Sequence, residues 1–422
     1  MSKIDKAAAV SLEFDETKVK KLSISELLKK VGPGIILTGI VIGPGAITTA
    51  SMLGAKYGYS LVWMYILIAF MGITYLLATY RLSMLTGMPT IHAIRHYYGN
   101  FAAGFTGLAL FLTCCFFTIG NISGTGAGMS LLFGIDWKYG ALIMIAVLIY
   151  CYFSKGVYSK IEKGIGLCVI AMIIAFYVTL VGTGGPDVKE MGIGLTHWQF
   201  PKGSIAMALG FLSTHAALTT GIYGTYLGAE KKWKKEDLFN GAMLVDSIAH
   251  VVGVILISAA IMLVAAIVLN PLGKVVKSPT QLAEMLVPVM GSIAKPIMGI
   301  ALLGAGFSSL LGNTQRGIVL LNAGFNKPTS LEDKSIKIGA FIVLAISTLI
   351  CFLYGGSPTE LIFIANLATA IATPVSGAFI LLMLWRKDTN GGLKASKVLR
   401  ICMTICYIIC IVLTIFSLQQ LF

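Results

Sequence analysis

Two short polar segments far apart in the chain nearly repeat each other inside long apolar runs. Residues 46–50 read Ala-Ile-Thr-Thr-Ala, and residues 217–221, which lie 171 positions later, read Ala-Leu-Thr-Thr-Gly. Gly43-Pro44-Gly45 precedes the first copy, and this triplet cannot continue an ordinary helix. Interrupted apolar helices at corresponding places in two halves indicate the substrate site of a secondary transporter. We therefore expect both segments to be unwound and to face each other.

The chemistry available at these breaks comes from backbone groups, hydroxyls and one imidazole. A break inside hydrocarbon is tolerated where it lines a polar cavity, because unsatisfied backbone groups cost several kcal/mol each there. Hydroxyl and carbonyl oxygens can bind a cation, freed N–H groups at helix starts can bind an anion, and Thr or Ser can instead bond back to its own helix. The candidate substrate-binding residues are Gly43, Gly45, Ala46, Thr48, Thr49, His215, Ala217, Thr219 and Thr220, with Ser213 beside them. Which residues would hold a metal ion stays open at this point.

Three ionisable residues within apolar segments are candidates for proton coupling. His215 lies beside the second break, where Gly221 and Gly224 are the expected flexible points. Burying an ionisable group within the membrane costs free energy, so such a residue is usually functional. A structural histidine is the alternative. Asp246 and His250 are four residues apart and share a helix face, as either a proton relay or a structural ion pair.

The elements that must position these residues are membrane-spanning helices. Hydrophobic residues make up 57% of the chain and charged residues 12%, about half the charge of a soluble domain. The apolar runs repeatedly exceed the roughly 20 residues that cross a bilayer as a helix. We predict an all-α polytopic membrane protein with eleven spans, at about 33–55, 59–84, 104–133, 137–154, 161–182, 204–228, 239–269, 296–321, 335–354, 358–385 and 398–418.

The basic charge of the chain fits a membrane orientation better than nucleic-acid binding. The net charge is +14, but with the N-terminus in the cytoplasm 25 of the 32 Lys and Arg fall in cytoplasmic segments, in line with the positive-inside rule. The expected location is the plasma membrane, with the C-terminus outside. The expected partners are the lipid bilayer and a small-molecule or ion substrate, and the chain can act as a monomer. Arg316 is expected to reach the cytoplasmic membrane interface.

The domain plan follows from the repeat. Residues 1–30 form a cytoplasmic N-terminal segment, and residues 31–422 form one transmembrane domain. Its halves, about 31–182 and 204–385, hold five spans each, and a last helix at 398–418 is appended. Because five is odd, the halves insert upside down relative to each other. The sequence contains no phosphate-binding loop, HExxH or nucleophile elbow, so we expect neither enzyme activity nor a cofactor.

Several motifs resemble the Nramp divalent-metal transporters. They are Gly32-Pro33-Gly34, Gly43-Pro44-Gly45, Gly54-Ala55 with Gly58-Tyr59 and Trp63, Arg81-Leu82 with Thr86-Gly87, Leu131-Leu132-Phe133-Gly134, Glu162, and Gly306-Phe307-Ser308-Ser309 with Gly312. The similarity runs over the first ten spans. It implies a LeuT-type fold, a 5+5 inverted repeat with broken helices 1 and 6, and alternating access. The substrate implied is a divalent metal ion between the two broken helices.

The chain departs from that family at the residues that hold the metal. The family motif Asp-Pro-Gly-Asn has Gly43 and Ala46 at its Asp and Asn positions, and the motif Met-Pro-His aligns with Ala217, Leu218 and Thr219. The acidic pair of the family's proton path aligns with Thr118 and Asn121. The thioether, which helps to select transition metals, and the carboxylates are therefore missing.

Three functions follow as hypotheses. The first is a carrier of divalent cations, taken with part of their water shell as Mg²⁺ prefers. The second is a carrier of a small organic acid or amino-acid-like anion, for example a 5-oxoproline-type carboxylate, because helix N-termini and hydroxyls without a carboxylate suit an anion. The third is a membrane receptor that transports nothing.

Overall fold

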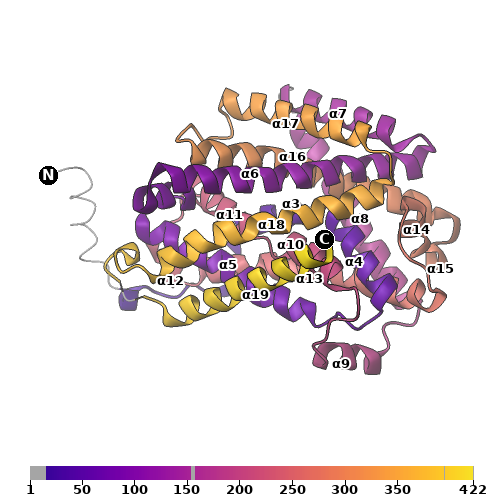
Figure 1. Cartoon of the computed structure of the whole chain (residues 1–422), viewed down its shortest axis with the longest axis horizontal. Helices are drawn as coiled ribbons and strands as arrows, with labels where there is room; N and C mark the ends of the chain where they lie inside the picture. Colours follow the sequence, from indigo (N-terminus) through magenta and orange to yellow (C-terminus); the bar gives the residue numbers. More distant parts are fainter. Residues whose placement is uncertain (1–15, 154–156, 394, 422) are drawn as a thin grey trace.

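The computed structural model describes residues 16–153, 157–393 and 395–421 (Figure 1). These residues form helices and short turns, with no strand in the described ranges. The longer helices are α3 (Pro33–Val41), α4 (Pro44–Tyr57), α5 (Met64–Thr86), α6 (Thr90–Phe133), α7 (Trp137–Phe153), α8 (Val157–Gly182), α10 (Ile205–His215), α11 (Leu218–Glu230), α13 (Ala242–Val268), α16 (Ala294–Gly324), α17 (Lys334–Leu353), α18 (Pro358–Trp385) and α19 (Lys397–Leu421). The short ones are α2 (Ile24–Lys30), α9 (Val188–Thr196), α12 (Lys235–Phe239), α14 (Pro279–Glu284) and α15 (Val287–Met290).

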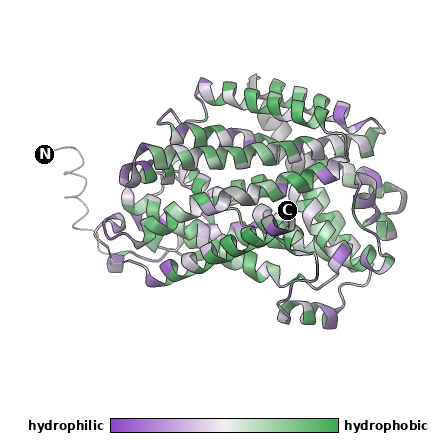
Figure 2. Ribbon diagram, viewed as in Figure 1, coloured by the Kyte–Doolittle hydropathy of each residue, from purple (hydrophilic) through white to green (hydrophobic). Residues whose placement is uncertain are grey.

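The predicted spans coincide with these helices. In the described ranges, eight segments are long and apolar enough to cross a membrane, and the bent pair α3–α4 makes a ninth. The described apolar parts of α7 (Trp137–Tyr150) and α8 (Val169–Gly182) coincide with the fourth and fifth predicted spans. Figure 2 shows hydrophobic residues along the middle of the long helices and hydrophilic residues toward their ends.

The loops gather at two opposite ends of the helix bundle. In Figure 1, α12 and the turn between α18 and α19 lie at one end, and α9, α14 and α15 lie at the other. Residues 1–15 of the predicted N-terminal segment are outside the described residues, as is the side chain of Glu162. The two ends correspond to the two groups of loops that the span prediction places on opposite sides.

The first predicted break is confirmed. α3 and α4 meet at a bend of 61°, and two non-helical residues separate them. Ile42 has φ −77° and ψ 77°, and Gly43 is extended with φ −112° and ψ −176°. Pro44 then occupies the first position of α4, where a proline's missing N–H costs nothing.

The second break is also confirmed, but not at the expected glycines. α10 ends at His215 and α11 begins at Leu218, so the chain opens at Ala216 and Ala217. Gly221 and Gly224 lie inside α11, where a Cβ atom would come within 2.9 Å of Tyr75 O and 2.8 Å of Tyr80, respectively. These glycines therefore serve close helix packing against α5 rather than flexibility.

The first break is held in place by two glycine contacts. A Cβ atom on Gly124 of α6 would lie 2.1 Å from Pro44 Cβ, and one on Gly306 of α16 would lie 3.2 Å from Pro44 Cγ. Because a proline ring cannot rotate out of the way, only glycine allows this approach. α6 and α16 thus fix the start of α4.

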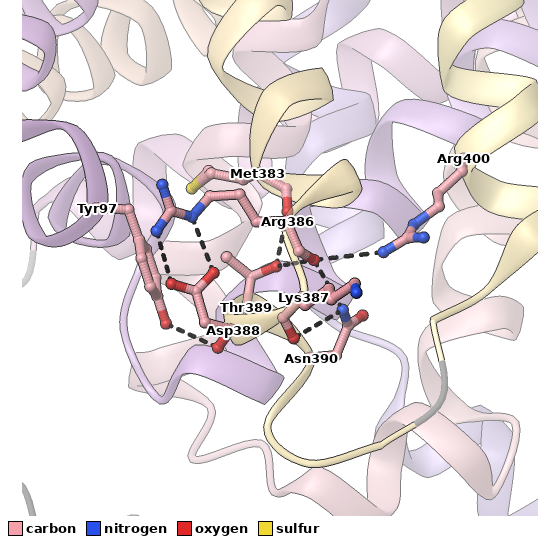
Figure 3. Close-up of polar contacts among 8 residues, drawn as sticks. All are labelled: Tyr97, Met383, Arg386, Lys387, Asp388, Thr389, Asn390 and Arg400. Atoms are coloured by element: carbon pink, nitrogen blue, oxygen red, sulfur yellow. Dashed lines mark hydrogen bonds and ion pairs between the residues drawn. The ribbon is translucent and has the colours of Figure 1, made fainter.

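The turn after α18 is fixed by a polar cluster (Figure 3). Arg386 forms an ion pair with Asp388 at 2.6 Å, and its guanidinium lies over the Tyr97 and Tyr98 rings at 5.2 and 5.4 Å. Arg400 of α19 donates to the main-chain carbonyl of Arg386 at 3.3 Å. This cluster ties α18 and α19 to α6 far from the two breaks.

Candidate functional site

The two breaks line one small cavity. Its volume of about 10 Å³ is room for about one water molecule, so the site is closed in this conformation. Five of the predicted substrate-binding residues line it: Gly43, Gly45, Ala46, Ala217 and Thr220. The remaining lining residues are Ile40, Val41, Phe117, Asn121, Thr214, Asn313 and Arg316.

The other predicted substrate-binding residues lie beside the cavity rather than on its wall. Thr49 donates to the Gly45 carbonyl at 2.8 Å, as a back-bonding threonine does. Thr48 and Thr219 are buried, and the Thr48 hydroxyl has no hydrogen-bond partner among the described residues. Ser213 donates to the main-chain carbonyl of Asn366 at 2.8 Å. That these residues take part in substrate binding stays a prediction.

His215 is buried just before the second break and does not line the cavity. Its Nδ1 lies 2.7 Å from the Phe211 carbonyl. A carbonyl only accepts, so this contact assigns the proton to Nδ1. Nε2 is then an acceptor without a partner among the described residues. His215 therefore keeps a free position for a proton or a ligand and remains a coupling candidate.

Asp246 and His250 do not form an ion pair with each other in the described structure; each contacts α3 instead. The Asp246 carboxylate accepts the Gly32 and Gly34 backbone N–H groups at 3.0 Å and the Tyr80 hydroxyl at 3.3 Å. His250 Nδ1 lies 3.0 Å from the Thr38 hydroxyl. The ion-pair alternative is thus wrong, and the two side chains fasten α3 onto α13.

Arg316 contradicts the expectation that it reaches the membrane interface. It is only 2% exposed, and its guanidinium lines the cavity. Nη2 donates to Asn313 Oδ1, Nη1 lies 3.5 Å from the Thr220 hydroxyl, and the group lies 5.7 Å from the Phe117 ring centroid. α16 continues to Gly324, about two turns beyond Arg316, so the side chain has no route to water along its own helix.

Asn366 of α18 joins the two breaks and was not anticipated. Its Nδ2 donates to the Gly45 carbonyl at 3.2 Å, and its main-chain carbonyl accepts from Ser213. A lone amide in an apolar run gives no signal that it meets two distant segments. Arg316 and Asn313 carried a weak signal, since Ser309, Asn313 and Arg316 recur at i, i+4 and i+7 and share one helix face.

The main-chain carbonyls at the end of α3, before the first break, already accept hydrogen bonds. The last carbonyls of α3 are already occupied: Gly39 O accepts from Ser308 at 3.1 Å, Ile40 O from Ser309 at 2.8 Å, and Val41 O from the Gly43 N–H at 2.9 Å. Across the described part of the chain, no three His, Cys, Asp or Glu side chains are grouped as a metal site would require. The ligands available to a cation are the neutral oxygens of Asn121, Asn313 and Thr220 and main-chain carbonyls.

Comparison with known proteins identifies a family and relatives that this chain resembles. Residues 34–420 match the family model described as "Natural resistance-associated macrophage protein-like", or Nramp. The divalent metal cation transporter MntH of Deinococcus radiodurans is 25% identical over 389 residues, which cover 89% of this chain and 86% of the relative. The MntH protein of Brucella suis is 24% identical over 377 residues, covering 86% and 82%.

The fold agrees with this match. The manganese transporter of Eremococcus coleocola superposes with a TM-score of 0.73 at 16% identity, covering 97% of this chain and 90% of that structure. MhsT in complex with L-phenylalanine superposes with a TM-score of 0.56 at 19% identity, covering 96% and 100%. The expected LeuT-type fold is thereby confirmed. The chain is a multi-pass membrane transport protein of the Nramp family.

Proposed function

We propose that the chain is a secondary-active carrier that binds its substrate in the cavity between the two breaks and works by alternating access. The observation that carries this proposal is that the α3–α4 and α10–α11 junctions line one closed cavity. A site of this kind opens to one side at a time when the half-helices move.

The relatives' names give divalent metal cations as the first substrate class to test. The uncharged oxygens of Asn121, Asn313 and Thr220 are hard ligands, and such ligands suit Mg²⁺ with part of its water shell better than Mn²⁺ or Fe²⁺. The closed cavity holds neither a hydrated ion nor an organic molecule, so either substrate requires the half-helices to part.

For orientation we propose a cytoplasmic N-terminus, an external C-terminus and a place in the plasma membrane. The Lys-rich α12 segment lies at the same end as the α18–α19 turn, which carries Arg386 and Lys387 (Figures 1 and 3). Positive charge at one end supports the positive-inside assignment. The carrier is proposed to act as a monomer.

For coupling we propose protons, taken up through His215 or through Asp246 and His250. The span-3 positions at which the family carries acids hold Thr118 and Asn121, which cannot titrate. His215 offers a free Nε2. The test is substrate-driven acidification of liposomes containing the His215→Ala or Asp246→Asn protein. Undiminished acidification in both variants would rule out these routes.

The transport proposal is tested with purified full-length protein in liposomes, with uptake of Mg²⁺, Mn²⁺ and small organic anions followed over time. A Cβ atom on Gly45 would lie 2.7 Å from Asn366 Oδ1, whereas one on Gly104 would meet its nearest neighbour at 3.7 Å. Saturable uptake that falls at least tenfold in Gly45→Ala and persists in Gly104→Ala supports a carrier at this site. Lack of saturable uptake of any of these substrates would contradict it.

A further inference from the structure

We propose that Arg316 binds the carboxylate of a small organic monoanion, so that the cargo of this carrier is a small monocarboxylate rather than a bare metal ion. The inference rests on the proposed function, since it takes the cavity between the breaks as the transport site. It goes beyond the relatives' names, which point to divalent cations.

The first argument is the uncompensated charge. Arg316 is 2% exposed, and its neighbours Asn313, Thr220 and Phe117 are all neutral. None of the ion pairs within the described ranges includes it. A buried charge is costly unless a counter-charge and hydrogen bonds accompany it. The missing partner is an anion.

The second argument is the hydrogen-bond inventory. Arg316 Nε and Asn121 Nδ2 are buried donors with no acceptor in the described part of the chain, and Asn121 is 4% exposed. The carbonyls at the end of α3 are already taken by Ser308, Ser309 and Gly43. A ligand entering here gains most by supplying acceptors, which a carboxylate does and a cation cannot.

The third argument is the direction of the backbone dipoles. α4, of 14 residues, and α11, of 13 residues, both begin at the cavity wall. The N-terminus of a helix carries a partial positive charge and free N–H groups, which favour anions. The C-terminal ends of α3 and α10 also reach the cavity, through Val41 and Thr214, and their partial negative charge opposes that of the helix starts. The net positive charge of the cavity therefore comes from the Arg316 guanidinium, which repels a metal cation that has lost its water.

The lining also limits the kind of anion. A planar guanidinium matches the two oxygens of a carboxylate, and one guanidinium balances one negative charge. Ile40, Val41 and Phe117 give the same cavity an apolar side, which suits a short organic body better than phosphate or sulfate.

The binding test uses purified full-length protein in detergent and isothermal titration calorimetry. The probes are the sodium salts of acetate, lactate and 5-oxoproline, with inorganic phosphate, MgCl₂ and MnCl₂ as the competing classes. We expect saturable binding of at least one monocarboxylate and an increase in its Kd of at least tenfold in Arg316→Gln. Arg386→Gln removes the same charge from the surface cluster of Figure 3 and should leave the Kd unchanged.

A second variant keeps the test decisive if Arg316→Gln does not fold. Asn121→Asp changes no volume but places a carboxylate at the cavity wall, where it competes with an anionic ligand for the guanidinium. We expect a fall of at least tenfold in monocarboxylate affinity. Unchanged affinity in this variant overturns the inference.

The possible results separate the inference from the proposed function. Monocarboxylate binding that depends on Arg316, together with uptake of the same compound into liposomes, supports both. Such binding without uptake supports the anion site and contradicts the carrier. Mg²⁺ or Mn²⁺ binding and uptake without monocarboxylate binding overturns the anion site and leaves the carrier standing. Phosphate binding alone, binding that survives in Arg316→Gln, or no binding at all overturns the inference.

Discussion

The contact between Asp246 and the start of α3 makes a quantitative prediction about how the helix is held. The Asp246 carboxylate accepts two backbone N–H groups, from Gly32 and Gly34, and the Tyr80 hydroxyl. A Cβ atom on Gly34 would lie 2.4 Å from the Asp246 carbonyl oxygen, so glycine is required for α3 to approach this closely. Asp246→Asn keeps the shape and removes the charge, which isolates the electrostatic part of the contact.

The expected cost follows from the number of bonds. A hydrogen bond to a charged acceptor contributes about 1.5–3 kcal/mol and one between neutral groups about 0.5–1.5 kcal/mol, so two N–H donors lose about 2 kcal/mol in total. Losing a negative charge at a helix N-terminus adds about 1 kcal/mol. The free energy of opening α3 should therefore fall by about 3 kcal/mol, which raises the equilibrium constant for opening roughly a hundredfold.

Hydrogen–deuterium exchange measures this opening directly, because amide exchange follows the local opening equilibrium. Peptides covering residues 33–41 should exchange roughly a hundredfold faster in Asp246→Asn, while peptides from α17 should not change. Asp388→Asn, at the exposed ion pair with Arg386, is the control for loss of one carboxylate. Unchanged exchange of residues 33–41 in Asp246→Asn would refute the view that this carboxylate holds α3.

Three further predictions concern other contacts. Gly124→Ala should lower stability by about 1–3 kcal/mol and so lower the thermal transition temperature, because its Cβ would lie 2.1 Å from the Pro44 ring. Gly104→Ala is the control, since its Cβ would lie 3.7 Å from the nearest atom. Equal transition temperatures in the two variants would contradict the packing argument. Asn366→Leu should cost about 1 kcal/mol and slow uptake, since it breaks the bond to the Gly45 carbonyl; wild-type uptake rates would argue against this link. Burial alone would raise the pKa of Asp237, but hydrogen bonds from Lys30, the Lys234 backbone and Asn240 lower it below its usual value. The contribution of Asp237 to stability is then present above the ordinary pKa of 3.8 and is lost as pH falls through the lowered pKa. Asp237→Asn should therefore reduce the acid sensitivity of the thermal transition. Identical pH profiles of the two proteins would contradict this.

The broken helices could be predicted because their cause is local. Gly43-Pro44-Gly45 interrupts a helix whatever surrounds it, and a repeat at Ala217 locates the partner segment without any knowledge of contacts. The spans could be predicted for the same reason, since apolar length alone sets them. The exact opening at Ala216 and Ala217 could not, because neither residue breaks helices on its own.

The charge of the site could not be predicted because it depends on which helix faces meet. The position of Arg316 in its apolar run is equally compatible with an interface anchor and a buried guanidinium, and only the packing of α16 against α6 and α11 decides between them. Asn366 likewise acquires its role from contacts with Gly45 and Ser213, which lie 321 and 153 residues away. A single sequence does not show that these residues lie close together in space.

The buried guanidinium of Arg316 also bears on the electrical behaviour of the transport cycle. A carrier that faces each side in turn exposes this positive charge first to one solution and then to the other, whereas a carrier loaded with a monoanion is neutral at that position. Only the return of the empty carrier then works against the membrane voltage, which contributes about 2.3 kcal/mol per charge per 100 mV across the full field. A negative interior should therefore slow net uptake and leave one-for-one exchange unaffected. The protein would then act mainly as an exchanger in an energised cell and as a net importer in a depolarised vesicle.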